Sequence, residues 1–244
     1  MNQPLFSILT ASHNQLPFIG QCIRSIISQS YPHWELIVID DMSRDGTYER
    51  ASDFAKFDNI KVFRNKRQLY CGMTYNKLLS LASGEFCGIV DGDDILEPDA
   101  IATVVMYYLA NPNIDFIWTK HKWGNTKLEK FRSGLSRSAR YGTIYHSEEG
   151  LSHVYSHWRT FRTNMREKGV LFRDLKCTVD KDLGYNLELL GPGGFLNLEL
   201  YKYRYHQKNM SHNSSQKAMW RKVRKYHKSG KNRYPSIKLQ ILKR

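Results

Sequence analysis

Several features that often reveal the class of a protein are absent from this 244-residue sequence. Its four cysteines lie far apart and form no CxxC pair, which argues against a zinc site or a disulfide framework. We interpret them as buried free thiols, which favours a reducing compartment. The chain shows no basic and apolar leader, and its longest apolar run, IATVVMYYLA, is too short to cross a bilayer. We therefore expect a soluble, cytoplasmic protein.

Acidic residues are missing from the last 45 positions, whereas 14 of the 37 lysines and arginines fall there. The body is formally neutral, so this tail carries the whole net charge of +14. Within 217–228, Met219, Trp220, Val223 and Tyr226 share one face of a helical pattern that basic residues surround. The pattern is typical of a helix on an anionic membrane. We expect peripheral contact at the inner face of a membrane, with a solvated basic tail as the alternative.

Two phosphate-binding motifs are absent as well. No GxGxxG follows the first apolar run, and no GxxxxGK[ST] occurs anywhere in the chain. The usual backbone cradles for a dinucleotide or a triphosphate are therefore excluded. Phosphate bound by this chain must be neutralised by a cation or by basic side chains.

Apolar runs and helical patterns alternate through the first half of the chain. The predicted strands cover 5–11, 34–40, 60–64, 85–91 and 115–121. The predicted helices cover 19–27, 48–57 with Thr47 as N-cap, 73–83 and 97–111. This alternation predicts one α/β domain with a mostly parallel, doubly wound sheet and helices on both faces.

Polar side chains follow three of these strands. The segment SHN follows the first strand, Asp40 and Asp41 follow the second, and FCGIVDGDD brings three further acids after the fourth. Ligands of such sheets bind outside the carboxyl ends of the strands. Capping of a turn or of a helix remains open as an alternative role for Ser12, Asn14 and Asp41.

The three acids Asp91, Asp93 and Asp94 need a positive partner. Like charges this close repel, and burying them unpaired would cost several kcal/mol each. A metal ion, a basic side chain or plain water could serve. Mg²⁺ and Mn²⁺ prefer hard oxygen ligands and could bridge the acids to a diphosphate, so a divalent cation is the favoured interpretation.

Four segments together resemble glycosyltransferase family 2. FSILTASHN is similar to the family's first strand, close to VSVIIPTYN, and IVIDDMSRDGT resembles its V-DDGSTDGT. GEFCGIVDGDD resembles GEYI-LDSDD, and YRYHQKNMS resembles a late YR-H---S segment. The match runs in order from about residue 5 to 211. The resemblance implies a GT-A fold, a nucleotide-diphosphate sugar donor, Mn²⁺ or Mg²⁺, and inversion at the anomeric carbon.

The resemblance also implies particular site residues. Asp91 and Asp93 match its DxD motif, with Asp93 as the first choice for direct metal contact, and Asp94 and His206 complete the implied metal set. His13 replaces the family's common tyrosine beside the base. The implied nucleotide-sugar-binding residues are Ala11, Ser12, His13, Asn14, Asp40, Asp41, Asn76, Asp91, Gly92 and Asp93. Arg204 is a weaker candidate for a phosphate contact.

An inverting transfer needs a general base that removes a proton from the acceptor hydroxyl. The segment CTVDKDLGYNLELLG resembles the family's ED-x-DL sequence, with Val179 in place of the glutamate. We predict Asp180 as the base and hold Asp182 as the alternative. Both acids could also simply occupy the first turn of a helix, where its dipole favours negative charge.

The expected organisation is a GT-A-like domain over 1–211 and a basic tail over 212–244. Within the domain we expect a nucleotide-sugar-binding half over 1–120 and an acceptor-side half over 121–211. The predicted function is a hexosyltransferase that builds a glycan on a glycan or lipid-linked acceptor. A sugar-nucleotide nucleotidyltransferase is a rival, although ASHNQLPF lacks that class's Gly- and Lys/Arg-rich loop. A basic nucleic-acid binder is the other rival, and it leaves the acids unexplained.

Overall fold

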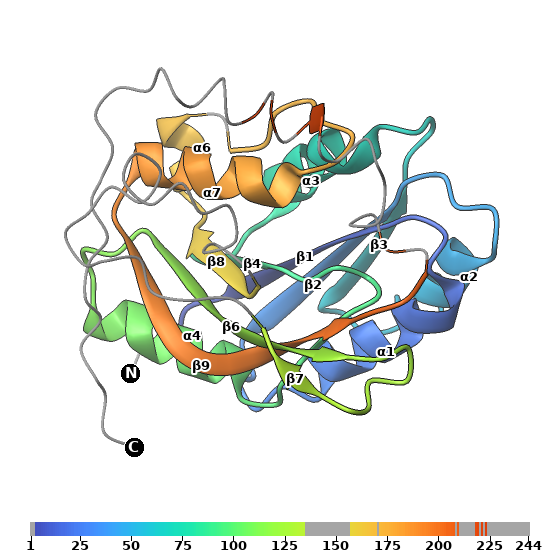
Figure 1. The fold of residues 1–244 in the computed structure, drawn as a ribbon, viewed down its shortest axis with the longest axis horizontal. Coiled ribbons are helices and arrows are strands. Elements are labelled where there is room, and N and C mark those ends of the chain that lie inside the picture. Colours follow the sequence, from blue (N-terminus) through green and yellow to red (C-terminus); the bar gives the residue numbers. More distant parts are fainter. Residues whose placement is uncertain are drawn as a thin grey trace.

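The computed structural model describes residues 3–134, 157–169, 171–207, 209, 218–219, 221 and 223. They form one curved nine-stranded sheet between two layers of helices (Figure 1). The strands are β1 (Phe6–Ser12), β2 (Trp34–Asp40), β3 (Ile60–Arg64), β4 (Phe86–Ile89), β5 (Ile95–Leu96), β6 (Phe116–Gly124), β7 (Arg132–Ser133), β8 (Arg159–Arg162) and β9 (Gly193–Arg204). The helices are α1 (Leu16–Ile27), α2 (Thr47–Ser52), α3 (Tyr70–Leu81), α4 (Ala100–Ala110), α6 (Met165–Lys168) and α7 (Val179–Leu190).

The sheet order is β3-β2-β1-β4-β8-β6-β9-β5, with β7 paired to β6. Strands β3, β2, β1 and β4 are parallel to one another, as the alternating sequence pattern predicts. Their carboxyl ends meet at one edge, which brings the loops after β1, β2 and β4 together. This half of the sheet positions three of the predicted polar segments.

The other half of the sheet is mixed, which the sequence pattern does not show. We expected the strand at 115–121 to continue the parallel series, but β8 lies between β4 and β6 and is antiparallel to both. Strand β9 then runs parallel to β6, with register shifts around Lys120. Short strand β8 gives little period-two signal because three of its four residues are buried.

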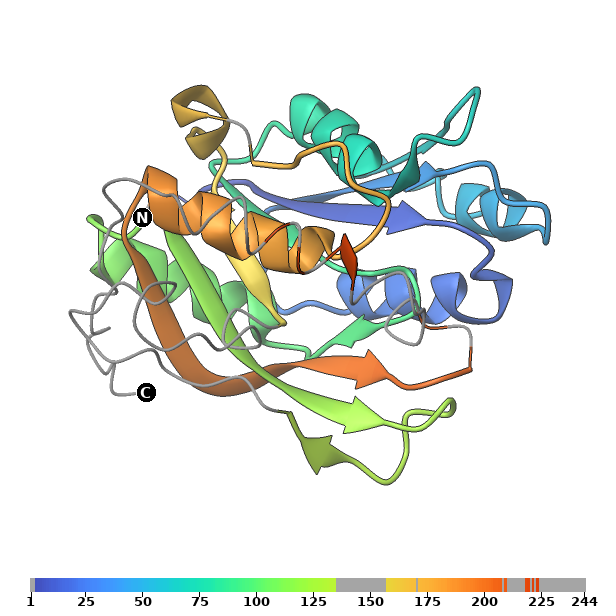
Figure 2. The same cartoon turned by 45° about the horizontal axis from the view of Figure 1, so that its top comes forward.

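Two hydrophobic cores form on opposite faces of the sheet because side chains alternate along each strand. In β2, Leu36 and Val38 belong to the core beneath α1 and α4. Ile37 and Ile39 belong to the other core, beneath α3 and α7. Figure 2 shows these helix pairs on the two sides of the sheet. Burial of each such side chain contributes roughly 1.5–3 kcal/mol before entropy is counted.

Helix α2 is shorter than predicted. It covers Thr47–Ser52, and its N-cap is Gly46, with φ of +91°, rather than Thr47. The Thr47 hydroxyl instead donates a hydrogen bond of 2.5 Å to Asp45 Oδ1. A left-handed backbone suits glycine at no steric cost, so Gly46 makes the entry turn.

The structure also bears on the expectations of free cysteines and of no membrane-spanning helix. All four cysteines are free thiols, and three are buried. Within the described part of the chain, no helix is both long and apolar enough to span a membrane. Of the predicted tail face, Trp220 and Tyr226 lie outside the described residues. Val223 is only 1% exposed, so at that position the apolar face packs against protein.

Gly72 allows α3 to lie close to the segment that leads into α7. A Cβ at Gly72 would lie 2.0 Å from the Arg173 carbonyl oxygen, and Gly72 N–H donates to the Leu175 carbonyl at 3.0 Å. We predict that Gly72→Ala lowers the free energy of unfolding by about 1–3 kcal/mol, because backbone must move. Urea denaturation measures this free energy of unfolding.

Gly20→Ala is the matched control for this prediction. A Cβ at Gly20, inside α1, would meet only the flexible ends of Arg50 and Arg24. Alanine also favours a helix by up to about 1 kcal/mol over glycine. Equal destabilisation by the two substitutions would contradict the packing argument.

Candidate active site

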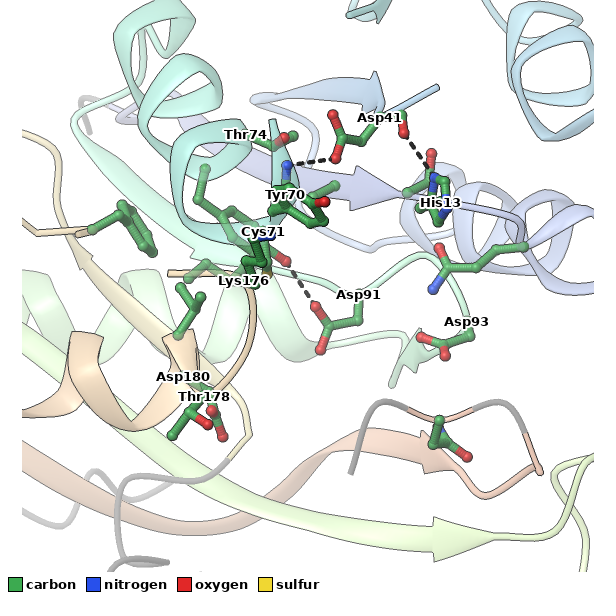
Figure 3. Close-up of a pocket in the computed structure, with 18 of the residues that line it drawn as sticks. His13, Asp41, Tyr70, Cys71, Thr74, Asp91, Asp93, Lys176, Thr178 and Asp180 are labelled. Atoms are coloured by element: carbon green, nitrogen blue, oxygen red, sulfur yellow. Dashed lines mark hydrogen bonds between the residues drawn. The ribbon is translucent and has the colours of Figure 1, made fainter. Parts of the chain in front are cut away.

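A cavity of about 530 Å³ opens at the carboxyl edge of the parallel strands (Figure 3). Its lining comes from the loops after β1, β2 and β4, the first turns of α3 and α7, the start of β8, the segment before α7 and the end of β9. Most of the predicted site residues line it, namely Ala11, Ser12, His13, Asn14, Asp41, Asp91, Asp93, Asp180 and His206.

The loop after β1 is fixed to the turn after β2. His13 Nδ1 donates to the Asp41 carbonyl oxygen at 2.7 Å, which sets the tautomer of the imidazole. Asn14 N–H donates to Ser43 Oγ at 2.8 Å, and Arg44 N–H donates to Asn14 Oδ1 at 2.9 Å. These contacts hold one face of the exposed His13 ring at the mouth of the cavity (Figure 3).

Asp41 closes the same end of the cavity. Its Oδ1 accepts hydrogen bonds from Leu69 N–H and Asn65 Nδ2, and its Oδ2 accepts one from Tyr70 N–H, each at 2.8 Å. The carboxylate therefore lies at the N-terminus of α3, where the helix dipole favours negative charge. Oδ2 retains an acceptor position for a ligand N–H or O–H.

Asp40 has a supporting position. It is fully buried and does not line the cavity. Its Oδ2 accepts from Ser43 N–H at 3.0 Å and lies 3.4 Å from Arg64 Nε. These contacts shape the turn that presents Asp41.

The acid turn, residues 91–94, holds its three carboxylates in three different ways. Asp91 Oδ1 accepts from the Tyr75 hydroxyl at 2.7 Å, and Asp93 Oδ2 lies 2.9 Å from His206 Nε2. Both of these acids line the cavity, whereas Asp94 is 1% exposed and does not. Asp94 accepts from the Tyr201 hydroxyl at 2.8 Å and from Arg204 N–H at 2.7 Å.

Burial and mutual repulsion disfavour the charged forms of these acids. Burial, followed by the nearby charge of Asp93, raises the pKa of Asp91 to about 6. Burial, followed by Asp93 and then Asp91, raises the pKa of Asp94 well above its ordinary value. A bound cation would relieve this repulsion.

Two overlapping sets of donors could hold a cation. Ligand atoms of Asp91, Asp94 and His157 lie within 4.8 Å of one another. The predicted set is Asp91, Asp93, Asp94 and His206, in which Asp93 Oδ2 and His206 Nε2 are already 2.9 Å apart. Of the predicted set we favour Asp91, Asp93 and His206, because these three line the cavity, whereas Asp94 does not and already accepts two hydrogen bonds. Either set combines hard oxygens with one imidazole, which suits Mn²⁺.

Arg204 does not face the cavity, contrary to the idea of a phosphate contact. The side chain is 1% exposed, and its Nε donates to the Asp93 carbonyl oxygen at 2.6 Å. Its other nitrogens donate to the Thr126 carbonyl oxygen and to Gln21 Oε1. Arg204 therefore fixes the backbone of the acid turn.

Asp180 and Asp182 have different environments although both begin α7. Asp180 lines the cavity, is 44% exposed at its side chain and lies 3.4 Å from Arg159 Nη2. Asp182 is fully buried, where the Arg173 guanidinium and Asn186 Nδ2 donate to its carboxylate. Only Asp180 is placed to reach a ligand in the cavity.

Buried polar atoms without partners point to a ligand. Among the described residues, six buried side-chain nitrogen and oxygen atoms have no hydrogen-bond partner. Three of the six, Ser12 Oγ, Gln15 Oε1 and His157 Nδ1, belong to residues that line the cavity. Such atoms are rare in folded proteins and call for an explanation, which a polar ligand would supply.

The remaining predicted residues lie just outside the cavity lining. Asn76 Nδ2 donates to the Phe172 carbonyl oxygen at 2.6 Å, which ties α3 to the segment before α7. A Cβ at Gly92 would press against Gln15, so this glycine lets the acid turn approach the loop after β1. Both residues position the lining without forming part of it.

Several lining residues were missed by sequence reasoning. They are Gln15, Gln68, Tyr70, Cys71, Thr74, Tyr75, Ile89, His157, Phe172, Lys176, Thr178, Val179, Lys181, Leu183, Tyr203 and Asn209. Arg159 also lines the cavity; from sequence, its segment HWRTFR fits packing and an acceptor-side role equally. Tyr75 in α3 and His157 before β8 belong to no motif, and the pairing of β8 with β4 and β6 brings His157 to the cavity. Lys176 and Lys181 flank the predicted base, and their charge beside a candidate acid was the available signal.

The family of the chain follows from comparison of its sequence with known families. The model of glycosyl transferase family 2 matches residues 7–170, which is more than half of the chain. This chain therefore belongs to the glycosyltransferase family 2, and the resemblance seen in the sequence is confirmed.

Curated relatives match over part of the chain. The chain is 34% identical over 100 residues to a putative teichuronic acid biosynthesis glycosyltransferase, TuaG, of Bacillus subtilis, covering 41% of this chain and 40% of that one. It is 32% identical over 122 residues to the Escherichia coli UDP-Glc:alpha-D-GlcNAc-diphosphoundecaprenol beta-1,3-glucosyltransferase WfgD, covering 50% of this chain and 47% of that one. The chain thus spans less than half the length of each.

Solved structures share the fold across most of the chain. S. aureus TarS 1-349 in complex with UDP-GlcNAc superposes with a TM-score of 0.72 at 19% identity, covering 89% of this chain and 64% of that one. The mannosyltransferase PcManGT from Pyrobaculum calidifontis, in complex with GDP-Man and Mn2+, superposes with a TM-score of 0.66 at 17% identity, covering 93% of this chain and 62% of that one. The fold is that of the GT-A glycosyltransferases.

Asp91→Asn should reduce the pH dependence of stability in the cation-free protein. The pKa of Asp91 is about 6 when folded, above the usual value of about 4 when unfolded. The folded state therefore holds this proton more tightly, so stability is lost as pH rises from 4 through 6. Urea denaturation in EDTA should show a smaller loss for the variant.

Asp58→Asn is the control, because it removes an exposed carboxylate that follows α2. Its pH profile should match that of the unaltered chain. If the stability of Asp91→Asn falls with pH as steeply as that of the unaltered chain, the charge on Asp91 does not destabilise the folded protein.

Proposed function

We propose that the protein transfers a sugar, with inversion, from a nucleotide-diphosphate sugar to a hydroxyl group of a glycan or lipid-linked acceptor. One observation carries the proposal. A single cavity is lined at one end by His13 and Asp41, at its middle by Asp91 and Asp93, and opposite them by Asp180. These are a polar end for a nucleotide, a cation-binding turn and an exposed carboxylate base, in the order that such a transfer requires.

The nucleotide would bind between the loops after β1 and β2. The ring of His13 offers a face for the base, and Asp41 Oδ2 offers an acceptor for a base N–H or a ribose hydroxyl. Ser12 Oγ, which has no hydrogen-bond partner among the described residues, would gain one from the ligand. The turn held by Asp40 keeps this end preorganised.

The diphosphate would lie over the acid turn. Asp93, Asp91 and His206 would hold a Mn²⁺ or Mg²⁺ ion, which when bound supplies positive charge to a departing diphosphate. Lys176, Lys181 and Arg159 also line the cavity and bring basic groups to the same space. Preorganised charge of this kind is usually the largest single contribution to catalysis.

Asp180 would act as the general base. Its side chain is half-exposed in the cavity, and Arg159 holds it at 3.4 Å through one nitrogen, which leaves the other carboxylate oxygen for an acceptor hydroxyl. The burial of Asp182 and its pairing with Arg173 support this choice of acid.

The comparisons support the donor and cation parts of the proposal by analogy. The TarS complex contains UDP-GlcNAc, and the PcManGT complex contains GDP-Man and Mn2+. The name of WfgD describes a UDP-Glc donor and a lipid-linked diphosphate acceptor. Residues 1–120 and 121–211 would form the donor and acceptor halves, since both ranges contribute to the cavity.

The basic tail would assist with location. Its lysines and arginines, each contributing about 1 kcal/mol near an anionic surface, would draw the protein to a membrane that holds a lipid-linked acceptor. Because Val223 is buried, the contact would depend on these charges more than on the apolar face of the tail.

Asp93→Asn should abolish the effect of Mn²⁺ on nucleotide-sugar binding. The change keeps the shape of the side chain and removes the charge that holds the cation. Calorimetric titrations of UDP-glucose, UDP-N-acetylglucosamine and GDP-mannose, with Mn²⁺ or EDTA, should show a cation-dependent gain in affinity for at least one donor. The variant should lose about tenfold or more of that gain, the scale seen even for outer metal positions.

The control is Asp99→Asn, which alters an exposed acid five residues beyond Asp94 that makes no capping hydrogen bond to α4. It should retain the cation effect in full. Cation-dependent affinity that survives in Asp93→Asn would refute the predicted metal set.

Asp180→Asn should lower turnover by roughly 10²–10⁴-fold while donor affinity is retained, since that is the usual contribution of a general base. Release of nucleoside diphosphate from the donor, with water as acceptor, measures turnover. Asp182→Asn should instead lower the melting temperature, because Arg173 would lose its charged partner. If Asp182→Asn slows the folded enzyme more than Asp180→Asn does, the assignment of the base is wrong.

A further inference from the structure

Two neighbouring strands carry aromatic and basic residues in strict alternation. The segment HKW of β6 and the segment YKYRY at the end of β9 place rings at every second position. His121 is in register with Tyr201, and Trp123 with Tyr203, in parallel pairing. Registered neighbours point to the same face of a sheet, so the rings share one face and the cations the other.

The rings form one continuous series of neighbours, the aromatic ladder, made of His121, Trp123, His157, Tyr201, Tyr203 and Tyr205. His157 stacks on Tyr201 with ring centroids 4.7 Å apart and 13° between planes. It also stacks on Tyr203 at 5.5 Å, and Tyr203 lies 5.8 Å from Trp123. Trp123 stacks on Tyr205 at 6.0 Å and 15°.

The ladder leads from the reaction centre to the surface. At its inner end, the Tyr201 hydroxyl donates to Asp94, and His157 and Tyr203 line the cavity. At its outer end, Trp123 is 39% exposed and Tyr205 is 46% exposed. The Trp123 indole is held in place because Nε1–H donates to His121 Nε2 at 2.9 Å.

The charges beside the ladder are neutralised within the protein. Lys122 lies 3.4 Å from Glu97 and 3.7 Å from Glu199, and Lys202 lies 2.9 Å from Glu97. Paired cations offer little to an anionic surface, so the outer end of the ladder is better suited to an uncharged ligand with an apolar face. Exposed apolar clusters that adjoin a cavity commonly mark such a binding site.

We propose that Trp123 and Tyr205 form an acceptor subsite on which a pyranose ring of the acceptor glycan packs. This inference rests on the proposed function. One face of a pyranose presents C–H groups, which carry partial positive charge and pack favourably on the negative face of an aromatic ring. A rigid aromatic platform also loses little entropy when it binds.

The position of the subsite agrees with the direction of attack. His13 and Asp41 lie at the end of the cavity built from β1 and β2, whereas the ladder lies along β6 and β9, which are neighbours in both views of the fold (Figure 2). The acid turn lies between them, bonded to Tyr201. An acceptor lying on the ladder would therefore reach the acid turn from the β6 and β9 side of the cavity.

Saturation-transfer NMR tests the subsite with uncharged disaccharides as probes: cellobiose, lactose, maltose and N,N′-diacetylchitobiose. Irradiation of the protein should transfer saturation to ring C–H protons of at least one probe. Trp123→Ala should lose most of that signal, whereas Trp123→Phe, which keeps a ring, should retain about half or more. Phe57→Ala is the matched control, because Phe57 is an aromatic side chain of similar exposure, 40%, outside the ladder.

Three outcomes would overturn the inference: no signal from any disaccharide, a signal unchanged in Trp123→Ala, or equal loss in Phe57→Ala. A fourth arm sediments each protein with phosphatidylglycerol vesicles. Loss of sedimentation in Trp123→Ala with an unchanged sugar signal would assign the ring to a membrane instead. Titration of UDP-sugars on the same samples shows whether the donor site is intact, so failure of the proposed function is distinguished from failure of the subsite.

Discussion

The contact between Asp94 and the end of β9 supports most of the site. Asp94 accepts from the Tyr201 hydroxyl and from Arg204 N–H, and the Arg204 guanidinium returns to the Asp93 carbonyl oxygen. A carboxylate that is 1% exposed needs such partners, because an unpaired buried charge is strongly unfavourable. The contact joins residues 110 positions apart and brings His206, two residues after Arg204, against Asp93.

The same contact divides the three acids into one that holds the fold and two that face the cavity. Asp94 is satisfied by protein donors, whereas Asp91 and Asp93 lie on the cavity wall, each with one side-chain hydrogen-bond partner among the described residues. Their mutual repulsion is tolerated because the surrounding strands fix the turn from both sides. The remaining repulsion between the carboxylates destabilises the folded protein, and a bound cation would relieve it. Such a cost to stability is common at functional sites.

The sequence predicted the parallel half of the fold and the polar residues that follow its strands at the cavity, because both depend on short-range signals. The periodic patterns of strands and helices are local. Once the strands are parallel, the motifs that follow them all lie at the same edge of the sheet. It did not predict β8 between β4 and β6, or the place of His157, because those follow from long-range antiparallel pairing. Arg204 was misjudged for a related reason: its burial depends on Asp94, Gln21 and Thr126, which are distant in the chain.

The change from parallel to mixed pairing at β4 gives the two ends of the cavity different chemistry. Parallel strands end in loops, and loops such as those carrying His13 and Asp41 offer polar atoms suited to a nucleotide. The pair β6 and β9 instead continues past the acid turn as an extended sheet, so it presents side chains at a period of two. Rings on one face and cations on the other follow directly from that period. A polar pocket and an aromatic platform can therefore adjoin the same carboxylates without either interrupting the core.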